Sequence, residues 1–187
     1  MSELHISFEG QSILAAPSMD DPNFSQSVVY MVRHTPEDAI GLVINRPSSV
    51  RIQQVIKSML DIDLDCQSPL FRGGPVDGPL VLIHDQPDAS DLSVAEDIFL
   101  SSDAHHIQEV IANPDATFRL IDGFAGWGPG QLEEEFETGC WLRSDIAFED
   151  LFSDPHDLWK RLIYRVGEHV ISRGKPSLRK PSRASWN

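Results

Sequence analysis

The sequence has few cysteines, no long apolar run and no recognisable leader, and each of these shortages excludes a class of protein. Its two cysteines, Cys66 and Cys140, form neither a CxxC pair nor a zinc-type spacing, which argues against a disulfide-rich or zinc-stabilised fold. We expect two reduced thiols, with a single disulfide as the alternative. No stretch approaches the roughly 18 apolar residues that span a bilayer, and the start of the chain lacks the basic and apolar regions of a secretory signal. We therefore expect a soluble, cytoplasmic protein that does not contact membranes.

Basic residues are also scarce and unevenly placed. The chain has 15 Lys and Arg against 29 Asp and Glu, for a net charge of −14. An acidic body repels the phosphate backbone, so direct nucleic-acid binding is not expected. Residues 173–187 carry five of the basic residues and no acid, which leaves −19 for residues 1–172. We predict one domain over 1–172 and a basic, flexible tail over 173–187, with a DNA or acidic-partner contact as the alternative for the tail.

What is present fits an ordinary globular domain. The 187 residues are 41% hydrophobic and 24% charged, enough for one substantial core. Four helices are expected. The first begins at Ile52 and is capped by Ser48 or Ser49, and the others begin after Asp103, near Pro129 and at Pro155. A loop is expected over 85–97. Strands are expected over 12–17, 27–34, 39–46, 80–84, 98–100, 117–124 and 141–146. Because the strands cluster and the helices do not strictly alternate with them, the pattern predicts a mixed α+β fold.

The stretch Asp122–Glu135 holds four glycines within eight residues and so resembles a phosphate-binding loop. The spacing fails the dinucleotide fingerprint, and Pro129 occupies the position of the Walker lysine. Three glutamates then crowd the helix start, where a phosphate would need positive partial charge. We predict a rigid strand-to-helix turn in which Trp127 is buried, with an exposed aromatic recognition surface as the alternative.

Two further turns carry polar or glycine-rich signals. Asn45-Arg46-Pro47 follows an apolar strand, and Arg46 there needs a carboxylate or carbonyl partner. It can serve as a structural tie or as an anion-binding arginine. Gly73-Gly74-Pro75 indicates a sharp turn.

Catalytic and metal motifs are missing. The sequence contains no HExxH pair and no GxSxG elbow, so neither a zinc protease nor a hydrolase nucleophile is indicated. The acidic run Asp61–Asp65 fails as a calcium loop, because Cys66 replaces its glycine and Arg72 its glutamate. We predict no catalytic residue, no metal and no cofactor, and we lean against an enzyme.

The three turns, taken in order, carry a resemblance to a known family. The blocks LAAPSMDDPNFSQSVVYMVRH, GLVINRP, GGPV and GFAGWGPGQLEEEF, with Trp141 shortly after, resemble the AlgH/YqgE family of bacterial proteins from about Gly10 to Gly174. The resemblance implies an α+β fold in which the sheet bifurcates or curls into a small barrel surrounded by helices. Family members are uncharacterised or are called transcriptional regulators, with no established activity or cofactor.

The matching blocks also imply which residues matter. The acidic loop over 85–97, Cys140 and the basic tail depart from the family pattern. The residues carried over are Pro17, Met19, Asp21, Phe24, Asn45, Arg46, Pro47, Gly73, Gly74, Pro75, Gly126, Trp127, Gly130, Gln131, Leu132 and Glu135.

Our leading hypothesis is a non-enzymatic binding or regulatory protein whose three turns form one surface for a protein or small-molecule partner. The first alternative is a nucleotide- or metabolite-binding protein, or an enzyme, with a cleft near Arg46. The second is DNA binding through the basic tail. The predicted binding residues are Asn45, Arg46, Pro47, Gly73, Gly74, Pro75, Gly126, Trp127, Gly130, Gln131 and Glu135.

Overall fold

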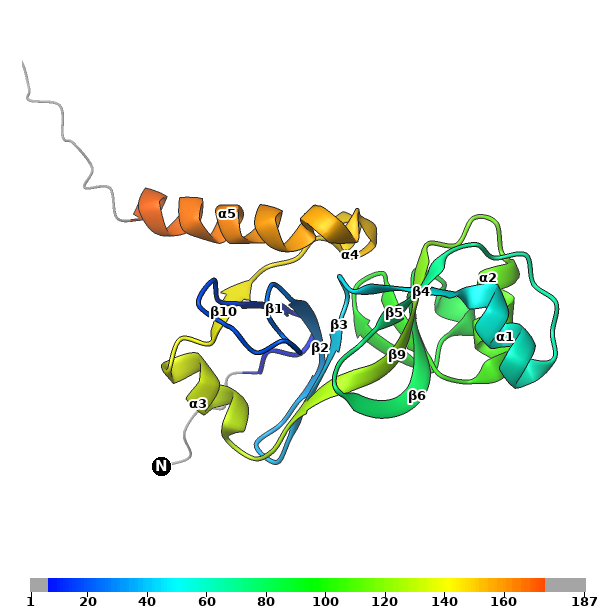
Figure 1. Ribbon diagram of the computed structural model, residues 1–187, viewed down its shortest axis with the longest axis horizontal. Coiled ribbons are helices and arrows are strands. Elements are labelled where there is room, and N and C mark those ends of the chain that lie inside the picture. The colour runs from blue at the N-terminus through cyan, green and yellow to red at the C-terminus, as the bar shows by residue number, and fades with distance from the viewer. Residues whose placement is uncertain (1–6, 174–187) are drawn as a thin grey trace, which may run out of the picture.

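The computed structural model describes residues 7–173 and is built around a ten-stranded sheet with helices packed on it (Figure 1). The strands are β1 (Ser12–Ala15), β2 (Val28–His34), β3 (Ala39–Val43), β4 (Pro47–Arg51), β5 (Pro69–Arg72), β6 (Val76–His84), β7 (Leu92–Ala95), β8 (Ile98–Ser101), β9 (Phe118–Trp127) and β10 (Trp141–Ser144). The helices are α1 (Ile52–Leu60), the short 3-10 helix η1 (Pro87–Ala89), α2 (Ala104–Ala112), α3 (Gln131–Glu137), α4 (Phe148–Phe152) and α5 (Pro155–Arg173).

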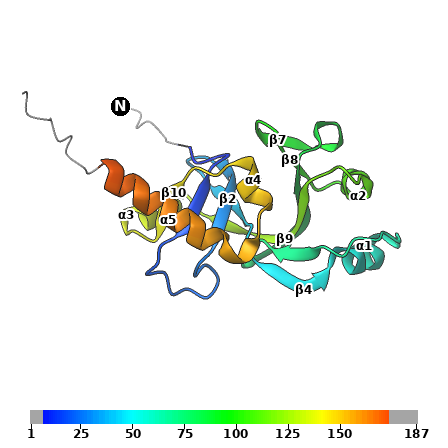
Figure 2. The same ribbon diagram turned by 90° about the horizontal axis from the view of Figure 1, so that it is seen from above.

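The sheet is curled, as the family resemblance implied. Its strands run in the order β10-β1-β2-β3-β9-β6-β8-β7. Although β1 and β7 lie far apart on this path, a Cβ added at Gly10, just before β1, would lie 3.2 Å from the Val94 carbonyl oxygen of β7. The two regions can meet only if the sheet bends round on itself, and Figure 2 shows this curvature from above.

Strand β9 is the point at which the sheet divides. One edge of β9 pairs with β6. The other edge pairs first with β5, in parallel through Phe71 and Arg72, and then with β3, antiparallel through Ala39–Gly41. Two strands therefore share one edge of β9, and the ends of β3 and β5 meet beside its middle.

Three apolar clusters fill the space between the sheet and the helices. The first contains Leu14, Tyr30 and Ile121 and is covered by α4 and α5. The second contains Trp127 and Trp141 with Leu132 of α3, and the third lies between α1, α2 and the sheet. Each helix thus buries its apolar stripe, which is the main source of helix stability in proteins.

Local signals predicted several helix starts correctly. The carboxylate of Asp103 accepts hydrogen bonds from the backbone N–H groups of His105 and His106, at 2.8 and 3.4 Å, and so caps α2. Asp154 accepts one from the N–H of His156 at 3.0 Å, where Pro155 opens α5.

Other expectations were wrong where long-range pairing decides the conformation. Ser48 and Ser49 do not cap α1, because Pro47–Arg51 is strand β4 and the N-cap is Arg51. The strand expected over 39–46 ends at Val43. The loop expected over 85–97 contains η1 and β7, since β8 provides a pairing edge for β7. The turn expected within Asp122–Glu135 is strand until Trp127, because β6 pairs with this strand up to Phe124 and β3 pairs with it from Ala125 to Trp127.

Candidate ligand-binding site

Backbone hydrogen bonds hold together the ends of β3 and β5 and the middle of β9. The N–H of Arg72 donates to the carbonyl of Arg46 at 2.9 Å, and the N–H of Val43 donates to that of Gly73 at 2.8 Å. The N–H of Gly73 donates to the carbonyl of Asp122 at 2.7 Å. Two of the three predicted turns, Asn45–Pro47 and Gly73–Pro75, are therefore neighbours in space.

Glycine is required at this junction because the backbones approach too closely for a side chain. A Cβ on Gly73 would lie 2.1 Å from the carbonyl oxygen of Gly123, and one on Gly74 would lie 2.2 Å from the carbonyl carbon of Phe124. Gly123 itself has φ +75°, a conformation that favours glycine. The glycine pair of the Gly73-Gly74-Pro75 turn is thus explained by packing alone.

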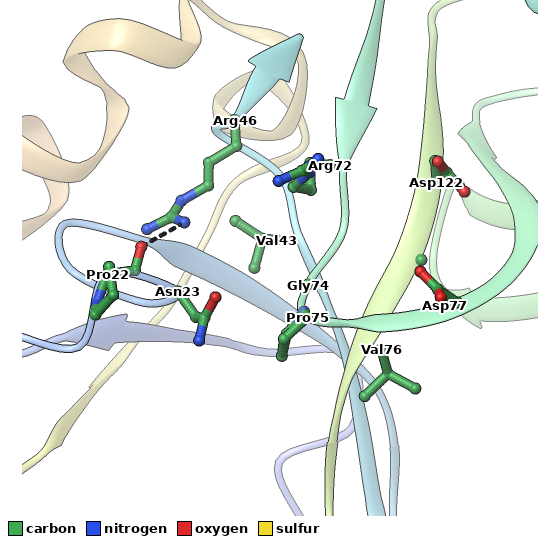
Figure 3. Close-up of a pocket in the computed structure, with 11 residues that line it drawn as sticks. Pro22, Asn23, Val43, Arg46, Arg72, Gly74, Pro75, Val76, Asp77 and Asp122 are labelled. Carbon is green, nitrogen blue, oxygen red and sulfur yellow. Dashed lines mark hydrogen bonds between the residues drawn. The ribbon is translucent and has the colours of Figure 1, made fainter.

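A cavity of about 340 Å³ opens beside this junction. In Figure 3, Arg46 and Arg72 lie on one side of it and Asp77 and Asp122 on another. The volume falls at the small end of the range for small-molecule pockets, roughly 300–1,000 Å³. The cavity is lined by Pro22, Asn23, Val43, Arg46, Arg72, Gly74, Pro75, Val76, Asp77, Asp122 and Gly123.

Arg46 forms part of the wall and also supports it. Its Nη1 donates to the carbonyl of Pro22 and its Nη2 to that of Ser25, both at 3.0 Å. Burial lowers the pKa of Arg46, as does the nearby charge of Arg72, whereas Asp21 opposes the shift. The partner that the sequence required is therefore a pair of carbonyl oxygens in the loop before β2.

The other charged groups of the cavity have no protein partner within the described part of the chain. The residues Arg72, Asp77 and Asp122 are exposed. None of their side chains makes a hydrogen bond or ion pair with any residue between 7 and 173. This holds even though Arg72 and Asp122 are partners in the β5–β9 register. Unpaired charges of both signs thus face a common space.

Asn45 has a different role from its neighbour Arg46. Its Oδ1 accepts from the N–H of Val28 at 2.8 Å and its Nδ2 donates to the carbonyl of Gln26 at 2.9 Å, so its amide fastens the loop before β2. A second cavity of about 210 Å³ lies on this side, between Arg46 and the start of α5 at His156 and Lys160.

The third predicted turn forms a separate cluster. Trp127 is only 5% exposed and packs against Phe24 and Trp141, as the favoured interpretation of a buried indole predicted. Glu135 Oε2 accepts from the indole N–H of Trp127 at 2.9 Å and from that of Trp141 at 2.7 Å. Its Oε1 accepts from Gln131 Nε2 at 2.9 Å. The polar atoms of this cluster are thus directed at one another.

The structure therefore brings together Arg46, Pro47, Gly73, Gly74 and Pro75. It places the five predicted residues of the third turn elsewhere, namely Gly126, Trp127, Gly130, Gln131 and Glu135. Sequence reasoning missed the remaining charges of the cavity. A signal was available: Arg72 and Asp122 each end an apolar stretch and directly precede a glycine.

Several other expectations concern absences or the chain ends. Within 7–173, no cluster of three or more potential metal-ligating side chains occurs, and Cys66 and Cys140 are both free thiols. No helix of that region combines the length and the apolar character needed to cross a bilayer. The predicted basic tail, apart from Arg173 at the end of α5, falls outside the described residues.

The chain is similar in sequence to known proteins over most of its length. The family model described as DUF179, AlgH-like, matches residues 12–171. A UPF0301 protein of Chlorobaculum tepidum is 31% identical over 185 residues, covering 95% of this chain and 97% of that protein. A UPF0301 protein of Thioalkalivibrio sulfidiphilus is 32% identical over 169 residues, covering 86% and 90%. This chain belongs to the AlgH-like family.

Solved structures agree with that assignment. The solution structure of the AlgH protein from Pseudomonas aeruginosa superposes with a TM-score of 0.69 at 27% identity and covers all of both chains. A crystal structure of a Corynebacterium diphtheriae protein gives a TM-score of 0.68 at 23% identity, covering 94% of this chain and 91% of that one, and supports the fold alone. The family consists of uncharacterised proteins, so the function must be argued from the site.

Proposed function

We propose that this protein is a non-catalytic binding protein that recognises the anionic group of a small molecule at the cavity beside β9. The observation that carries the proposal is that two arginines, Arg46 and Arg72, line one open cavity in a protein of net charge −14. Burial is the main cause that lowers the pKa of Arg46, and the charge of Arg72 adds to it; an anion placed beside both guanidinium groups would offset that repulsion.

The composition of the wall favours binding over covalent catalysis. Its residues include no Ser, Thr, Cys, Lys or His, the side chains that most often act as nucleophiles. The arginines stay protonated and serve as hydrogen-bond donors. A regulatory role would then depend on the ligand changing the loop before β2, which Arg46 anchors, rather than on a DNA contact by the acidic body.

Arg72 provides the test, because it faces the cavity without supporting the fold. Substituting Arg46 or Trp127 would also disturb packing, whereas Arg72→Ala removes a donor with no protein partner among the described residues. Arg33→Ala is the matched control, since Arg33 is an exposed strand arginine whose ion pair is with Asp38, and such pairs contribute little.

Thermal denaturation would be followed with succinate, inorganic phosphate and adenosine monophosphate as probes. A ligand at 100 times its Kd stabilises a protein by about 2.7 kcal/mol. We expect at least one probe to stabilise the wild type and the Arg33→Ala variant but not Arg72→Ala. If no probe stabilises the wild type, or if Arg72→Ala responds equally, the proposal is wrong.

A further inference from the structure

We propose that the ligand of this cavity is a free α-amino acid, held by its carboxylate at Arg46 and Arg72 and by its ammonium group at Asp77 and Asp122. This inference rests on the proposed function, since it assumes that the cavity binds an anionic group. It adds a second charge of opposite sign, which makes the ligand a small zwitterion.

The wall of the cavity carries its positive and negative charges at separate places. Arg46 and Arg72 lie together, and Asp77 and Asp122 lie together at another part of the cavity (Figure 3). The two carboxylates oppose a purely anionic ligand in the same small space and so weaken its attraction to the arginines. A ligand with both charges is attracted at both ends and should therefore bind more tightly than its deaminated analogue.

Two opposite charges of the wall, on Arg72 and Asp122, are neighbours but are not paired with each other. Arg72 and Asp122 are register partners on the parallel strands β5 and β9, a position at which opposite charges normally attract. Yet neither forms an ion pair with any residue in 7–173. Because both residues line the cavity and are not paired with each other, each retains its capacity to bind a ligand group.

The cavity has room for a small metabolite. Its volume of about 340 Å³ lies at the small end of the range of roughly 300–1,000 Å³ for small-molecule pockets. The remaining wall includes Pro75 and Val76, which provide apolar contact for a side chain. An aliphatic amino acid therefore fits the composition of the wall.

Matched probes separate the two charges. L-Leucine carries both, 4-methylpentanoate lacks the ammonium group, and 3-methylbutylamine lacks the carboxylate. Affinities would be measured by isothermal titration calorimetry near neutral pH, for L-leucine and the other standard amino acids and for the two analogues. We expect an amino acid to bind at least about 10-fold more tightly than either of its analogues, since one charge-assisted hydrogen bond contributes about that much.

Two variants assign the contacts. Asp122→Asn should weaken the amino acid about 10-fold or more and leave 4-methylpentanoate unchanged or tighter, whereas Arg72→Gln should weaken both. Asp115→Asn, an exposed aspartate outside the cavity, is the control and should change neither.

The outcomes separate this inference from the proposed function. Arg72-dependent binding of 4-methylpentanoate without tighter binding of any amino acid would overturn the zwitterion and keep the anion site. Amino-acid binding that Asp122→Asn and Asp77→Asn leave intact would also overturn it. If neither the amino acids, the analogues nor the anionic probes bind, both proposals fail.

Discussion

Replacing Glu135 by alanine should be one of the most damaging single changes on helix α3. The carboxylate accepts from two indole N–H groups, at 2.9 and 2.7 Å, and from Gln131 at 2.9 Å. The indoles belong to Trp127 and Trp141, which are 5% and 2% exposed, so water cannot readily replace the lost acceptor. Leaving one buried donor unpaired costs about 1–3 kcal/mol.

For two such donors, we expect Glu135→Ala to lower the free energy of unfolding by about 3 kcal/mol. A protein of this size loses about 2–4 °C of Tm per kcal/mol, which corresponds to a fall of roughly 6–12 °C. Guanidinium unfolding followed by tryptophan fluorescence measures the change directly, and an unchanged m-value would show that two-state unfolding is preserved.

The control is Glu137→Ala, which removes an exposed glutamate from the same helix and should change stability by less than about 0.5 kcal/mol. A double-mutant cycle with Trp141→Phe tests the specific contact. The cost of Trp141→Phe should be smaller once Glu135 is gone. A loss of under about 1 kcal/mol for Glu135→Ala, or additive effects in the cycle, would refute the account of this cluster.

Two further predictions concern backbone packing and pH. Gly73→Ala places a Cβ 2.1 Å from the Gly123 carbonyl oxygen and should destabilise the fold by several kcal/mol. Gly167→Ala in α5, with open space around it, should instead stabilise the fold by about 0.5–1 kcal/mol. Equal Tm values for the two variants would contradict this prediction. Burial lowers the pKa of His84 below 6.5, so the unfolded chain takes up the proton first and stability should fall as the pH drops below about 6.5. The free energy of unfolding, measured at several pH values, should show this fall. The pH dependence should be weaker in His84→Gln and unchanged in His156→Gln, which replaces an exposed histidine. A pH dependence that His84→Gln leaves unchanged would contradict the prediction.

The direction of that pH dependence follows from the burial of His84 on β6, where its side chain has two hydrogen-bond partners. Its Nδ1 accepts from the N–H of Gln86 at 3.2 Å, so its Nε2 carries the proton and donates to Ser101 Oγ at 2.9 Å. The Ser101 hydroxyl in turn donates to the carbonyl of Ala89 at 2.7 Å. Burial is the main reason that the neutral ring is favoured in the folded state, and these hydrogen bonds are ones that a neutral ring can make.

The amino-acid sequence by itself determined those features that depend on neighbours in the chain. Asp103 and the Asp154-Pro155 pair mark helix starts because a cap acts within three residues. Alternation and apolar runs located most strands, and the missing lysine in Asp122–Glu135 was enough to argue against a phosphate loop. The family blocks, read together, implied a curled sheet that periodicity alone did not.

Tertiary structure decided everything that depends on pairing between distant segments. Strand β9 continues to Trp127 because β3 supplies a hydrogen-bonding edge for Ala125–Trp127, beyond the point at Phe124 where the pairing with β6 ends, a condition that no local pattern records. Gly73 is required by close packing and not by a ligand, because a Cβ at this position would lie 2.1 Å from the carbonyl oxygen of Gly123. The cavity exists because two strands end at the same edge of β9, so that Arg46, Arg72 and Asp122, far apart in sequence, face one space. Long-range backbone pairing, rather than local propensity, therefore created the candidate site.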